Sequence, residues 1–67
     1  MTDDKMVRMV NQIAAFFATQ PDTDKAAKVA AHITDFWDPV MRAQLDAYAR
    51  RGGAGLSPLA LDAAGLL

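Results

Sequence analysis

The chain of 67 residues contains no cysteine and only one histidine, His32. The absence of cysteine excludes disulfides, thiolate metal sites, iron–sulfur ligation and cysteine nucleophiles, and it is typical of a protein from a reducing cytoplasm. A single histidine also argues against a zinc site built from this chain alone. Because a domain of this size usually needs disulfides, a metal or a partner for stability, these absences favour a partner protein.

The chain also has little net charge. The net charge is −1, and the 7 basic residues are scattered among 8 acidic ones. Nucleic-acid binding by neutralisation of phosphates therefore has little support. The longest apolar runs, such as "IAAFFA", are too short to span a bilayer, and the start "MTDDKMVRMV" lacks the charged-then-apolar order of a signal peptide. We predict a cytoplasmic chain that binds neither nucleic acid nor membrane.

Apolar residues, in contrast, are abundant, at 52% of the chain without counting glycine. The usual share in soluble domains is about 45–50% with glycine included. A small body has proportionally more surface, so part of this apolar material must be exposed or covered by another protein. This leads to the hypothesis that the isolated chain self-associates through the surface meant for its partner.

The apolar residues recur at helical spacing, and no alternating strand pattern occurs. We predict an all-α fold, a small bundle of three helices plus a short C-terminal helix, in a single helical domain spanning residues 1–67. The expected helices cover approximately residues 3–19, 23–36, 39–51 and 58–64. The apolar stripe of the first helix consists of Met6, Val10, Ile13 and Phe17.

Capping residues define the predicted helix ends. Asp22 or Thr23 is expected to cap the second helix. Asp38 with Pro39 after it, and Ser57 with the proline after it, each match a cap followed by the first helical position. Proline is favoured there because its missing N–H would have no helical partner. The glycines of "GGAGLS" are expected to end the third helix in a turn.

The sequence contains only weak matches to motifs for catalysis or for binding a phosphate, a metal or DNA. "GGAGLS" lacks the Lys-Ser/Thr ending and the preceding strand of a phosphate-binding loop. His32 and Asp35 are three residues apart, but such a pair without further ligands or a nucleophile is typical of a surface contact. The arginines of the third helix are interrupted by aspartates, which disfavours a DNA-recognition helix. The residues therefore indicate no catalytic, cofactor or metal site in this chain.

The stretch "FWDPVMR", residues 36–42, combines two large aromatic side chains with a helix start. We expect Phe36 and Met41 to pack in the core. Trp37, in contrast, lies at a corner where full burial in so small a domain is difficult. Tryptophan and arginine are frequent anchors of protein interfaces. The hypothesis is therefore that Trp37 and Arg42 face a partner, as parts of a small helical protein-binding module.

Three segments of the chain carry a more specific pattern. They are "MVNQIAAFFA" at residues 9–18, "VAAHITDFWDPVMRAQL" at residues 29–45 and "GGAGLSPLA" at residues 52–60. Any one alone is weak, but their combination in this order resembles the delta subunit of bacterial NAD-dependent formate dehydrogenases that contain molybdenum or tungsten. The resemblance covers most of the chain.

The resemblance implies a non-catalytic accessory subunit that stabilises or helps assemble a cytoplasmic, heteromeric formate dehydrogenase by binding its large catalytic subunit. That enzyme oxidises formate to CO2, and the molybdopterin with Mo or W, the iron–sulfur clusters, FMN and NAD belong to its other subunits. Two alternatives stay open, a transient maturation chaperone for molybdenum cofactor loading and a small DNA-binding regulator. The candidate interface residues are Phe36, Trp37, Asp38, Pro39, Arg42, Leu56, Ser57 and Pro58.

Overall fold

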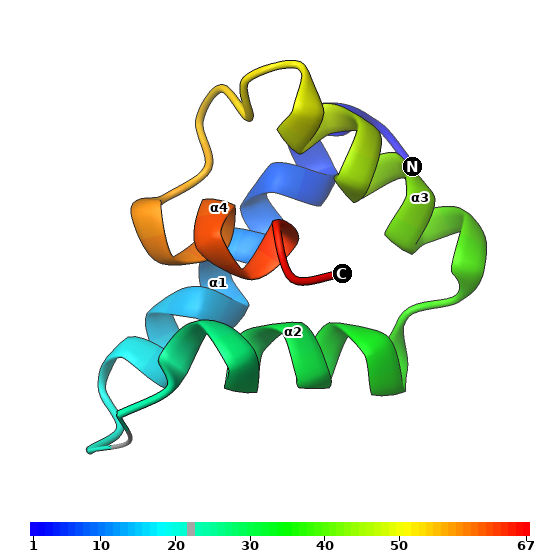
Figure 1. The fold of residues 1–67 in the computed structure, drawn as a ribbon. Coiled ribbons are helices and arrows are strands. Elements are labelled where there is room, and N and C mark those ends of the chain that lie inside the picture. Colours follow the sequence, from blue (N-terminus) through cyan, green and yellow to red (C-terminus); the bar gives the residue numbers. More distant parts are fainter. Residues whose placement is uncertain (22) are drawn as a thin grey trace.

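The computed structural model describes residues 1–21 and 23–67, and these residues form four α-helices without any strand, which confirms the predicted all-α fold. The helices are α1 (Asp3–Ala18), α2 (Lys25–Phe36), α3 (Pro39–Arg50) and α4 (Pro58–Ala64). In Figure 1, α2 runs along the bottom of the view, α1 passes behind α4 toward the start of α2, and α4 lies in the middle of the fold. The short C-terminal helix is therefore a central element of the bundle.

The start of α2 differs from the prediction. The helix begins at Lys25 and not at residue 23, and its N-cap Asp24 makes no side-chain capping hydrogen bond. Of the two expected caps, Thr23 precedes the helix, and Asp22 lies outside the residues that the structure describes. The Lys25 ammonium donates instead to the carbonyl of Ala18, 2.8 Å away, which ties the first turn of α2 to the end of α1.

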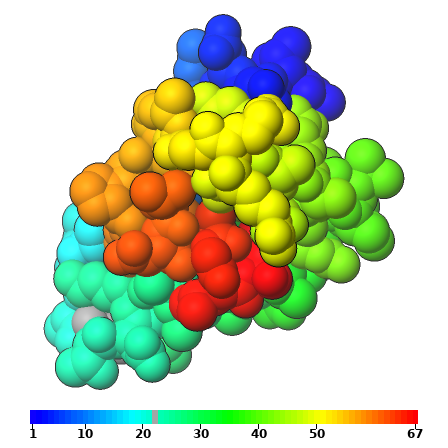
Figure 2. Space-filling view, turned by 45° about the horizontal axis from the view of Figure 1, so that its top comes forward, coloured from blue at the N-terminus to red at the C-terminus, as the bar shows by residue number. Residues whose placement is uncertain are grey.

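The core forms around α4, which contacts each of the other three helices and packs most extensively on α2. Three alanines of α4 are fully buried, and their small side chains let the backbones of neighbouring helices approach closely. The space-filling view shows that the outer side of this C-terminal segment, coloured orange to red, lies at the surface of the molecule between the other segments (Figure 2). The buried hydrophobic residues of the core are Met6, Val10, Ala14, Val29, Ala30, Ile33, Trp37, Leu45, Ala60, Ala63 and Ala64.

The turn after α3 confirms the predicted glycine stop. Gly52 and Gly53 both have positive φ, at 112° and 63°. Their N–H groups donate to the carbonyls of Ala49 at 3.0 Å and Tyr48 at 3.1 Å, which satisfies the last turn of the helix in the Schellman arrangement. A Cβ atom on Gly53 would lie 2.6 Å from Leu61 Cδ1, so glycine also permits the loop to pack against α4.

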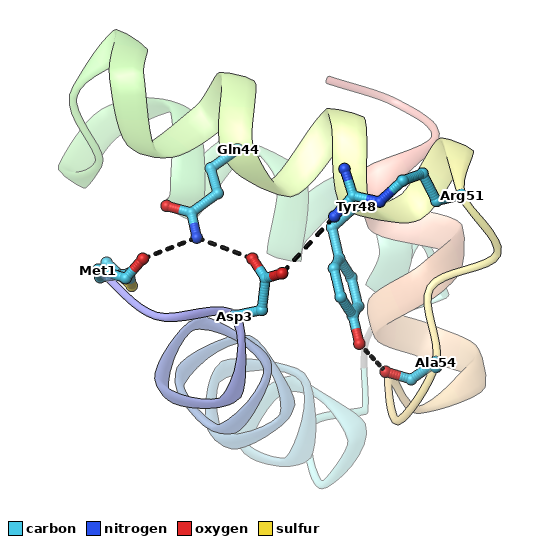
Figure 3. Close-up of polar contacts among 6 residues, drawn as sticks. All are labelled: Met1, Asp3, Gln44, Tyr48, Arg51 and Ala54. Carbon is cyan, nitrogen blue, oxygen red and sulfur yellow. Dashed lines mark hydrogen bonds and ion pairs between the residues drawn. The ribbon is translucent and has the colours of Figure 1, made fainter.

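Polar contacts join the N-terminus to α3 (Figure 3). The Gln44 amide donates to the carbonyl of Met1 at 2.9 Å and to Asp3 Oδ1 at 3.0 Å. Asp3 also forms an ion pair with Arg51 at 3.6 Å, and the Arg51 guanidinium lies 5.5 Å from the ring centroid of Tyr48. These groups are largely exposed, so each contact contributes little individually, but together they fix the first turn of α1 beside α3.

Candidate partner-binding surface

The corner between α2 and α3 is formed by only two residues, Trp37 and Asp38. Both have extended backbone, with ψ of 142° and 167°. The Asp38 carboxylate accepts a hydrogen bond from the N–H of Met41 at 2.8 Å, and Pro39 occupies the first helical position. These contacts confirm the predicted cap, and they fix the direction in which the chain leaves α2.

The assignment of the two aromatic residues at this corner was wrong. Trp37 is buried, with 6% of its surface exposed, whereas Phe36 is 75% exposed. The helical stripe explains the reversal, because Ile33 is buried and Trp37 follows it by four residues on the same face. The backbone N–H of Trp37 still donates to the Ile33 carbonyl at 2.8 Å, so the helical hydrogen-bond pattern extends to the tryptophan. Phe36 is rotated by about 100° from this face and points to solvent.

Met41 and Arg42, at the end of the stretch from residue 36 to 42, also have roles within the fold. Met41 is half-buried and packs against the core, as expected. Arg42, which we expected to face a partner, donates from Nη1 to the carbonyls of Trp37 at 2.7 Å and Thr34 at 3.2 Å. An arginine that binds the free carbonyls at the end of a helix stabilises that end. Arg42 therefore holds α3 against the end of α2, and its contact with a partner remains a prediction.

The second group of candidate interface residues, Leu56, Ser57 and Pro58, starts α4. The Ser57 hydroxyl accepts from an N–H in the first turn of α4 at 3.2 Å, as the predicted cap. The Asn11 amide of α1 adds two hydrogen bonds, donating to the Gly55 carbonyl at 2.9 Å and accepting from the Ser57 N–H at 2.8 Å. The sequence prediction missed this role of Asn11, because the partner atoms lie more than forty residues away.

The structure does not bring the two groups of candidate interface residues together. One group precedes α3 and the other follows it, so the length of that 12-residue helix separates them. At 1.5 Å per residue this is about 18 Å. Figure 1 shows the corner and the turn after α3 at opposite ends of this helix. A single small partner site that contains all eight residues is therefore not formed.

A different group of side chains is continuous on the surface. We define the aromatic row as Phe16, Phe17, His32 and Phe36, contributed by α1 and α2. The ring centroids of Phe16 and Phe17 are 5.2 Å apart, those of Phe17 and His32 are 6.0 Å apart, and those of His32 and Phe36 are 4.7 Å apart. Phe16 and Phe36, at the two ends, are 61% and 75% exposed. The row is therefore an apolar surface open to solvent.

A groove accompanies the aromatic row. It has a volume of about 270 Å³ and is lined by Gln12, Ile13, Phe16, Phe17 and His32. Two features of the sequence are consistent with this surface. The adjacent Phe16 and Phe17 cannot both face the core from one helix, and His32 and Phe36 are four residues apart on one face of α2.

No cluster of three or more histidine or acidic side chains comes together within residues 1–21 and 23–67. In the same part of the chain, no helix is both long and apolar enough to cross a membrane. What the structure presents is a small all-α bundle with an exposed aromatic row and a groove between two helices.

Comparison with known proteins identifies the family of this bundle. The family model described as NADH-dependent formate dehydrogenase delta subunit FdsD matches residues 5–64 of the chain. Because the match includes all of α2, α3 and α4 and nearly all of α1, the chain belongs to this family. A comparison with curated proteins found no match.

Proposed function

We propose that the chain is a non-catalytic accessory subunit that binds and stabilises, or helps assemble, a cytoplasmic NAD-dependent formate dehydrogenase. Its partner is the large molybdopterin-containing subunit, and the iron–sulfur clusters, FMN and NAD are held elsewhere in the complex. Membership of a formate dehydrogenase delta subunit family supports this function. The observation that carries it is Phe36, a large aromatic residue that the fold leaves 75% exposed beside a fully capped corner.

Removal of the chain tests this function. In a strain that lacks it, we expect formate-dependent NAD reduction in the cytoplasmic extract to fall, because the large subunit fails to assemble or is unstable. The measurement combines that activity with the amounts of the large subunit and of the assembled complex. Expression of the chain from a plasmid is the control and should restore both.

Two results would contradict the proposal. Unchanged activity and unchanged assembly in the deletion strain would mean that the enzyme does not depend on this chain. Lost activity with the chain present only in trace amounts in the purified wild-type enzyme would favour a transient maturation chaperone for the molybdenum cofactor.

A further inference from the structure

We propose that α3 is a hinged arm, which opens as a unit while α1, α2 and α4 stay packed against one another. The opening uncovers Leu45 and the side of α4 that α3 covers. It is a property of the isolated chain and is independent of the proposed function. Three features support it: the sparse packing of α3, the polar contacts that hold it closed, and the separate attachment of the segments on both sides of it.

The packing of α3 is sparse. Leu45 is the single buried residue of this helix, whereas α1, α2 and α4 bury three residues each. α3 contacts α4 less extensively than α1 and α2 do, and its contacts with α1 and α2 are smaller still. A groove of about 300 Å³ remains between α3 and α4, with Asp46, Arg50 and Leu61 among its lining residues. Local opening occurs in elements that few buried apolar contacts hold, and α3 is the helix that meets this condition.

The contacts that hold α3 closed include several polar ones at the surface. Asp3 of α1 accepts a hydrogen bond from the Gln44 amide at 3.0 Å and pairs with Arg51, just after α3, at 3.6 Å. The Gln44 amide also donates to the carbonyl of Met1 (Figure 3). At the other end of the helix, Arg42 donates to carbonyls at the end of α2. Exposed ion pairs contribute little to stability, so the closure of α3 is weaker than the apolar packing of the other helices.

The segments on both sides of α3 are attached to the other helices without it. Before α3, Trp37 is 6% exposed and continues the buried face of α2. After α3, the Asn11 amide of α1 donates to the Gly55 carbonyl at 2.9 Å and accepts from the Ser57 N–H at 2.8 Å, which holds the start of α4. Gly52, with a φ of 112°, gives the backbone freedom between α3 and this attachment. The helix can therefore leave the bundle while Trp37 and α4 stay in place.

Native-state hydrogen exchange of the full chain, followed by NMR for each residue, tests the proposal. We expect the slowest amides of α3 to exchange at least about tenfold faster than the slowest amides of α1, α2 and α4, because α3 opens without global unfolding. At low urea concentrations, the exchange of α3 should also rise less steeply than that of the other helices. The reason is that this opening exposes less surface than complete unfolding does.

The variant Asp3→Ala tests the polar contacts. It removes the partner of Gln44 and Arg51, so the slowest amides of α3 should exchange about 2- to 10-fold faster. Asp4→Ala is the matched control, because Asp4 lies in the same turn of α1 and, among the residues that the structure describes, forms no hydrogen bond or ion pair with α3. It should leave the exchange of α3 unchanged, since α1 is helical in both the closed and the opened form.

Three results would overturn the proposal. Exchange of α3 with the same rate and the same urea dependence as α1, α2 and α4 would mean that the four helices open as one cooperative unit. Faster exchange of α1 or α2 than of α3 would mean that the weakly held helix is a different one. If Asp3→Ala accelerated the exchange of α3 no more than Asp4→Ala does, the contacts with Gln44 and Arg51 would not hold the arm closed.

Discussion

Replacing Trp37 with alanine is expected to unfold the chain at room temperature. Only 6% of the surface of Trp37 is exposed, and truncation of a buried aromatic residue costs about 3–5 kcal/mol. The core of a domain this small supplies only about 3–5 kcal/mol of net stability. Circular dichroism at 222 nm (a wavelength standard for helices) during a thermal melt should therefore show lost helix content and no cooperative transition.

The neighbouring Phe36 provides the matched control for this prediction. Phe36→Ala removes a side chain of similar size that is 75% exposed, so the free energy of unfolding should change by only about 0.5 kcal/mol. The structural assignment of the corner would be wrong if Trp37→Ala melted like the wild type. It would also be wrong if Phe36→Ala were the variant that lost its helices.

Substituting Asn11 with aspartate should destabilise the fold by about 1–3 kcal/mol. The carboxylate can still accept the hydrogen bond from the Ser57 N–H, which measures 2.8 Å in the wild type. It cannot donate to the Gly55 carbonyl, 2.9 Å from the amide nitrogen, and it places a negative charge against that oxygen. A urea unfolding curve, with the midpoint and slope compared with the wild type, gives the change in free energy.

A control substitution at the adjacent Gln12 separates the loss of the Asn11 hydrogen bond from the effect of the added charge. Gln12→Asp also introduces a carboxylate into α1, but at an exposed position with no hydrogen bond to the loop before α4. It should cost less than Asn11→Asp by about 1 kcal/mol or more. An equal decrease in the free energy of unfolding in the two variants would mean that the hydrogen bonds of Asn11 with Gly55 and Ser57 do not stabilise the fold.

The helices were predictable because their signals are local. Asp38 with Pro39, and Ser57 with its following proline, each place a hydrogen-bond acceptor and a restricted φ within four residues of the helix start. The start of α2 was less predictable, since Asp24 makes no side-chain cap. The central position of α4 was not predictable either. Its seven residues are too few for an isolated helix, so its place depends on the packing of its buried alanines against the other helices.

The candidate surface was only partly predictable. The stretch from Phe36 to Arg42 was correctly singled out as a corner, but which aromatic side chain is buried depends on the register at the end of α2. One residue of register decides between Phe36 and Trp37, and helix ends are the least certain part of a sequence-based prediction. The aromatic row also required the structure, because Phe17 and His32 come from two helices and meet only after packing.

The residues of the stretch from 36 to 42 have different roles in the structure. Trp37 completes the core, Asp38 caps α3, and Arg42 binds the last carbonyls of α2. Of the two aromatic residues at the corner, Phe36 is the one that is exposed, and its ring continues the row through His32. The capped corner thus holds Phe36 in a fixed position at the edge of a rigid bundle, as an interface anchor requires.

Site-specific photo-crosslinking from position 36 tests the central claim most directly. A benzophenone amino acid replaces Phe36 in the chain within the intact formate dehydrogenase complex, and the same group at Leu66 serves as the control. We predict that illumination links position 36 to the large subunit and that mass spectrometry locates the attachment within that subunit. A complex that contains the chain but gives no crosslink from position 36, or gives one to the large subunit only from position 66, would contradict the account.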